Sequence, residues 1–86
     1  MIIILTVERN PYKSVILLGS EGDLLVVSEG CNVKFTLENS GEVKTGTVVK
    51  FFGKDEGLKI QIIPSGEEYE EIWSIASIVE GSLKVV

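Results

Sequence analysis

Short runs of apolar residues, separated by turn-forming residues about every ten positions, dominate the sequence. Glycine, proline, asparagine and serine gather between these runs, and such punctuation is typical of a chain of short strands. No segment shows a sustained apolar period of 3.6 residues, so long helices are not expected. The pattern predicts strands over residues 2–8, 13–18, 23–28, 33–38, 42–53, 58–62, 69–75 and 83–86, with a single helical turn over residues 75–78.

The clearest alternation of apolar and polar residues lies in the strand over 33–38. Val33, Phe35 and Leu37 are predicted to face the core, because successive side chains of a strand point to opposite faces. The strand over 42–53 has Gly46 in its middle, and an interior glycine often marks a bulge or a sharp bend. We expect a bend at Gly46 that lets one strand serve two sides of a barrel.

Composition and length agree with an all-β fold. The chain has 86 residues, which is room for one domain with one core. Apolar residues make up 44%, and most of them are isoleucine, valine and leucine, which suit a pleated surface. We expect a single domain with a small barrel over residues 30–86 and an additional N-terminal β-hairpin region over residues 1–29. The N-terminal strands either extend this barrel or expose an apolar face for oligomerisation.

The stretch Lys44-Thr45-Gly46-Thr47-Val48-Val49, followed by a loop and Leu58-Lys59-Ile60-Gln61-Ile62, resembles the glycine-centred pattern of KOW domains. The order of strands, hairpins and a late helical turn from Gly30 onward is similar to SH3-like small barrels, including the KOW and Tudor types. The chain also resembles small uncharacterised bacterial and phage proteins that pair a Gly-Thr-Val strand with a late Glu-x-Trp or Glu-x-x-Trp strand. The resemblance implies an SH3-like barrel and, in the KOW type, RNA, ribosomal or polymerase partners.

The net charge is −5, which weighs against a binder of phosphate backbones, since such proteins are usually basic. KOW domains usually carry basic residues in their loops, whereas this chain is acidic after Pro64. A protein partner is therefore favoured over nucleic acid. The alternative is a nucleic-acid-binding small barrel with one face of lysines, in which the strand alternation would place Lys34, Lys44, Lys50, Lys54 and Lys59.

Catalytic, metal-binding and cofactor-binding residues are not expected. The chain has no histidine, and its one cysteine, Cys31, has no partner for a nucleophilic dyad or a disulfide. Carboxylates could do acid–base chemistry only in a cleft, and the interior of so small a barrel is filled by side chains. The acidic residues after the Ser65-Gly66 turn match no calcium-binding loop; they are Glu67, Glu68, Glu70 and Glu71.

We expect a cytoplasmic protein with no membrane partner, because residues 1–7 are too short to cross a bilayer and no export signal is visible. A lone cysteine also fits a reducing compartment.

Aromatic residues are the remaining candidates for a binding surface. Phe51 and Phe52 are adjacent in a strand, so one should lie in the core and the other at the surface. Exposed aromatic rings near lysines can stack on a base or a peptide. The candidate partner-binding residues are Phe52, Trp73, Tyr69, Lys50 and Lys54. The sequence thus predicts a non-catalytic protein-interaction module, an accessory or regulatory protein, with a homodimer through the N-terminal strands as a further hypothesis.

Overall fold

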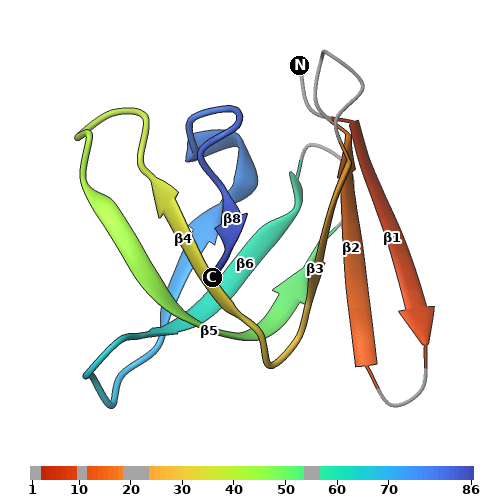
Figure 1. The fold of residues 1–86 in the computed structure, drawn as a ribbon, viewed down its shortest axis with the longest axis horizontal. Coiled ribbons are helices and arrows are strands. Elements are labelled where there is room, and N and C mark those ends of the chain that lie inside the picture. The colour runs from red at the N-terminus through yellow and green to blue at the C-terminus, as the bar shows by residue number, and fades with distance from the viewer. Residues whose placement is uncertain (1–2, 10–11, 19–23, 54–56) are drawn as a thin grey trace.

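The protein folds into two antiparallel β-sheets with one short 3-10 helix (Figure 1). The computed structural model describes residues 3–9, 12–18, 24–53 and 57–86, and in the first two ranges it describes side chains only at Val15 and Ile16. The three-stranded sheet has the order β1 (Ile3–Arg9), β2 (Tyr12–Leu18), β3 (Leu24–Ser28). The five-stranded sheet has the order β7 (Glu71–Ser74), β6 (Lys59–Pro64), β5 (Val43–Phe52), β4 (Asn32–Thr36), β8 (Lys84–Val85), with the 3-10 helix Ile75–Ser77 between β7 and β8.

The all-β expectation is confirmed, and the positions of the strands and of the helical turn agree with the sequence pattern. The N-terminal region differs from the expected hairpin: β1 and β2 do form a hairpin, but β3 adds to β2 as a third strand. In the described ranges the strands form no closed barrel, because β7 and β8 end the five-stranded sheet without pairing to each other. The sheet instead curls, as Figure 1 shows.

Strand β5 joins the two halves of the five-stranded sheet. Its first half pairs with β4 and its second half with β6, and Gly46 lies between Val33 on one side and Pro64 on the other. The expected irregularity is present but displaced, since the register with β6 shifts between Val48 and Lys50. Gly46 has a different physical role. A Cβ atom built there would lie 2.5 Å from the carbonyl oxygen of Ile63, so only glycine allows this approach of two backbones.

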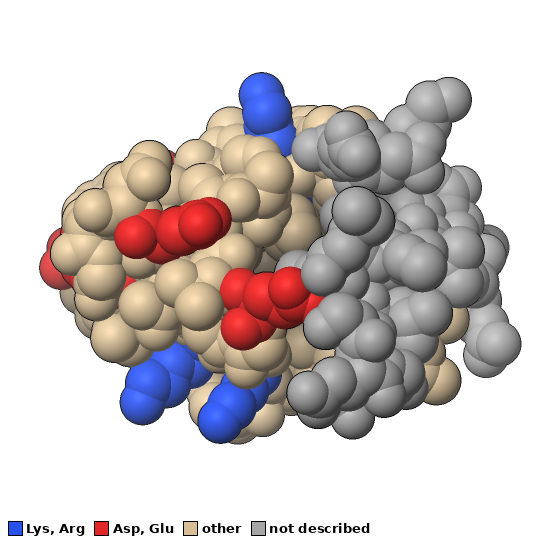
Figure 2. Space-filling view, turned by 90° about the horizontal axis from the view of Figure 1, so that it is seen from above, with Lys and Arg blue, Asp and Glu red and all other residues tan. Residues whose placement is uncertain are grey.

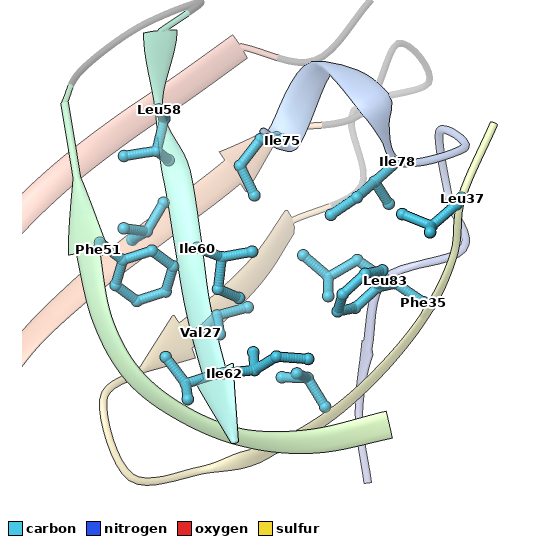
Figure 3. Packing of buried hydrophobic residues seen from close by; sticks show 13 residues of the cluster. Val27, Phe35, Leu37, Phe51, Leu58, Ile60, Ile62, Ile75, Ile78 and Leu83 are labelled. Atoms are coloured by element: carbon cyan, nitrogen blue, oxygen red, sulfur yellow. The ribbon is translucent and has the colours of Figure 1, made fainter. Parts of the chain in front are cut away.

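One hydrophobic core takes residues from both sheets. Val27 of β3 points into the same interior as Phe51, Ile60 and Ile62 of the other sheet (Figure 3). The predicted inward positions in β4 are confirmed, because Val33 and Phe35 are fully buried. No polar or charged side chain is buried among the described residues. The cluster consists of Val15, Val27, Val33, Phe35, Leu37, Val48, Phe51, Leu58, Ile60, Ile62, Ile75, Ile78 and Leu83.

The close approach at Gly46 gives a stability test. Replacing Gly46 by alanine should lower the free energy of unfolding by about 1–3 kcal/mol, because the methyl group has to displace the backbone of β6. Gly57→Ala is the matched control, since no described residue lies within 4 Å of a Cβ there, and its effect should stay within about 0.5 kcal/mol. Urea unfolding measures both. Equal effects of the two substitutions would contradict the close approach.

Candidate functional site

A cluster of charged and aromatic side chains lies at the rim of the inner face of the five-stranded sheet. Glu71 and Trp73 are the register partners of Ile62 and Ile60, so their side chains point to the core side of β7. The Lys44 ammonium lies 3.1 Å from a Glu42 carboxylate oxygen and 3.4 Å from one of Glu71. The same ammonium lies 5.4 Å from the centre of the Trp73 ring. The indole N–H donates to Glu71 at 3.3 Å, so the cluster connects β5 to β7 across β6.

The pKa of Lys44 is raised above its ordinary value of 10.5. The largest cause is the hydrogen bond to Glu42; burial acts in the opposite direction, and the hydrogen bond and charge of Glu71 add to the rise. Only 17% of the Lys44 side chain is exposed. Two carboxylates thus hold this lysine charged and compensate that charge, which leaves it poorly placed to bind an external anion.

The candidate partner-binding residues do not gather on one surface. Phe51 is buried and Phe52 half-buried, as expected for neighbours on opposite faces, and the Lys50 ammonium lies 4.7 Å from the centre of the Phe52 ring. Trp73 is on the opposite side of the sheet and packs against the core. Tyr69 is exposed in the β6–β7 connection, and Lys54 lies outside the described residues. A binding role for these five stays a prediction.

The lysines that the alternation assigned to one outer face are also separated. Lys34, Lys50 and Lys59 are exposed, whereas Lys44 is held in the inner cluster. On the described part of the face in Figure 2, lysine or arginine side chains stand apart at the margins, with acidic side chains between them. That distribution does not provide the continuous positive surface that a phosphate backbone favours.

Exposed apolar side chains are more prominent than exposed basic ones. On β3, Leu24 is 68% exposed and Val26 is 53% exposed, while Val27 between the sheets is fully buried. Ile72 is 54% exposed on the outer face of β7. The apolar run containing Leu24 and Val26 was visible in the sequence. The exposure of Ile72 could not be predicted from the sequence, because the register of β7 with β6 decides which of Ile72 and Trp73 faces outward.

The described residues include several carboxylates and one cysteine. They contain no group of three or more histidine, cysteine or acidic residues placed to hold a metal ion. Cys31 is a free, half-buried thiol packed against the core. None of the described elements is a helix of the length and apolarity needed to cross a membrane.

Comparisons of the chain with protein-family models, curated proteins and solved structures gave no significant match.

The raised pKa of Lys44 can be measured by NMR titration of its side chain between pH 8 and 12 (roughly the range over which lysines titrate). Glu42→Gln and Glu71→Gln should each lower this pKa, because both carboxylates raise it through a hydrogen bond and through their charge. A group whose pKa is raised on folding stabilises the fold below its unfolded pKa, and the stabilisation is lost as the pH rises through the folded pKa. The stability difference between wild type and Lys44→Met should therefore shrink above pH 10.5. A stability difference between wild type and Lys44→Met that does not change with pH would contradict the stabilisation of charged Lys44 by the two carboxylates.

Proposed function

We propose that the protein is a non-catalytic interaction module, an accessory or regulatory protein that acts by docking an exposed sheet surface on another protein. The proposal includes an SH3-like arrangement of residues 30–86. Two features support this arrangement: the strand order β7-β6-β5-β4-β8 and the 3-10 helix between β7 and β8. The succession of β4 to β8 along the chain, with the helical turn before β8, is the element order on which the resemblance was based.

The observation that carries the proposal is the apolar outer face of β3. Leu24 and Val26 are two residues apart and thus project from the same face, away from the buried Val27. The register partner of Val26 is Ile16, which extends the apolar surface onto β2. Full burial of a large apolar side chain is worth about 1.5–3 kcal/mol, so covering this face is a substantial driving force for association.

A second copy of the chain is the partner we propose for this face. An isologous dimer places the same patch of both subunits together, so the patch has to tolerate its own charge. The chain has a net charge of −5, and two copies repel wherever their acidic surfaces meet. Leu24, Val26 and Ile16 are uncharged, so contact through this face avoids that repulsion.

Nucleic-acid binding through lysines is the second candidate. Its support is the Phe52 ring beside Lys50, with Lys59 as the register partner of Phe52. An aromatic ring flanked by ammonium groups can stack on a base. The compensated charge of Lys44 and the negative net charge rank this function below protein interaction.

Sedimentation equilibrium of matched valine variants tests the dimer. Val26 and Val43 are both strand valines with similar exposure, 53% and 52%. We expect the wild type and Val43→Lys to associate with equal affinity. Val26→Lys should weaken association about tenfold or more, because it places two like charges in an apolar contact. A wild-type protein that is monomeric at high concentration would exclude the dimer, and equal effects of the two substitutions would place the contact elsewhere.

A further inference from the structure

We infer that the free edge of β7 binds an extended, basic segment of a partner protein as an added β-strand. The inference rests on the proposed interaction function and names the chemistry of one partner. It uses a different surface from the homodimer, because β7 belongs to the five-stranded sheet and β3 to the three-stranded sheet.

The backbone of β7 offers hydrogen-bonding groups at this edge. Among the described strands β7 pairs with β6 alone, and the Ile75 amide donates to the Leu58 carbonyl at 2.9 Å. Hydrogen-bonded pairs recur at every second residue of an antiparallel ladder, so Trp73 also bonds to β6 while Ile72 directs its N–H and C=O away from it. The next outward carbonyl, that of Ser74, accepts a bond from the Ser77 hydroxyl at 2.7 Å. Ile72 is therefore the residue at which an incoming strand would pair.

The side chains beside this edge suit an extended segment with an apolar residue. Ile72 is more than half exposed on the outer face, and Tyr69 is exposed just before the strand. In a cross-strand pair, side chains of register partners lie on the same face about 5 Å apart. A β-branched residue opposite Ile72 would therefore cover it. Added strands of this kind derive affinity from main-chain bonds and specificity from alternate side chains.

The charge of the β6–β7 hairpin determines the charge of the segment. Glu67, Glu68 and Glu70 are exposed there, whereas the charge of Glu71 is compensated by Lys44. The turn is held by a bond from the Glu67 amide to the Pro64 carbonyl at 3.0 Å and by Gly66, whose φ of 81° suits glycine. Glu67 and Glu68 are thus exposed in the turn that leads into β7, and Glu70, exposed just before the strand, accepts a hydrogen bond from the Gln61 side chain of β6. These carboxylates attract lysine or arginine at alternate positions of an incoming strand and repel an acidic one.

Charged residues at a sheet edge also discourage non-specific pairing, and β7 is only four residues long. Both features set the expected strength of the interaction. A short edge accepts few main-chain bonds and buries little area, which is typical of weak, transient complexes. The carboxylates then select basic segments over other exposed strands, including those of a second copy of this acidic chain.

The direct probe is a synthetic eight-residue peptide that alternates lysine and valine, with the glutamate–valine peptide as its control. Both are titrated into the full-length protein, labelled with nitrogen-15, by NMR at low salt. We expect the lysine peptide to shift the amides of residues 70–74 and the glutamate peptide to shift none. Raised salt should weaken binding of the lysine peptide, because it screens the attraction of the carboxylates. The triple variant Glu67→Gln, Glu68→Gln, Glu70→Gln should also weaken this binding, because it removes three of the charges.

Two substitutions of one residue separate the main chain from the side chain. Ile72→Pro removes the outward N–H of residue 72 but leaves the hydrogen bonds between β7 and β6 in place. An edge strand tolerates proline at such an outward position. The proline substitution should lower the affinity for the lysine peptide about tenfold or more. Ile72→Thr keeps the amide and should lower this affinity less. The amide shifts of Ile60 and Phe35 report whether each variant keeps its fold.

The inference is overturned if the lysine peptide does not bind, if both peptides bind equally, or if the folded Ile72→Pro variant binds as tightly as the wild type. Shifts confined to β3 would also overturn it while leaving the proposed interaction function standing. If the wild type dimerises but does not bind the peptide, only the inference about the β7 edge is rejected and the proposed dimer stands.

Discussion

The burial of one apolar face of each sheet in a common core is the constraint on which the remaining structure depends. A domain of 86 residues buries a smaller fraction of its surface than a larger domain does, so its stability depends on the apolar area that both sheets contribute. Val15 and Val27 of the three-stranded sheet pack in the same cluster as Phe51 and Leu58. Because alternate residues of a strand are used in this way, the intervening residues point outward. Leu24, Val26 and Ile72 are apolar residues among them and are therefore exposed.

The sequence allowed the strands and the inward positions of β4 to be predicted, because these depend on local alternation. It also predicted that Phe51 and Phe52 lie on opposite faces, and the structure shows that Phe51 is the buried one and Phe52 the half-buried one. The register shift past Val48 and the reason for Gly46 were not predictable, since both depend on how β5 meets β6. The cluster of Lys44 with Glu71 was missed for the same reason: the two residues are 27 positions apart in the chain. Its discovery required the registers of both β5 and β7 with β6.

The positions of charge and apolar surface separate two modes of association. The outer face of β3 is uncharged and extended by Ile16, which suits contact between identical acidic chains. The edge of β7 that pairs with no other described strand lies just after three exposed glutamates, which suits a basic partner. The inner cluster supports the second surface, because Lys44 compensates Glu71 and links β5 to the edge strand.

Native-state hydrogen exchange tests the common core most directly, since it reports the free energy of opening for each protected amide. If both sheets share one core, the most protected amides of β3 open with the same free energy as those of β6. Both should also respond equally to added denaturant. Exchange of the β3 amides at a free energy well below that of β6, with little dependence on denaturant, would show that the three-stranded sheet opens separately and would contradict the shared core.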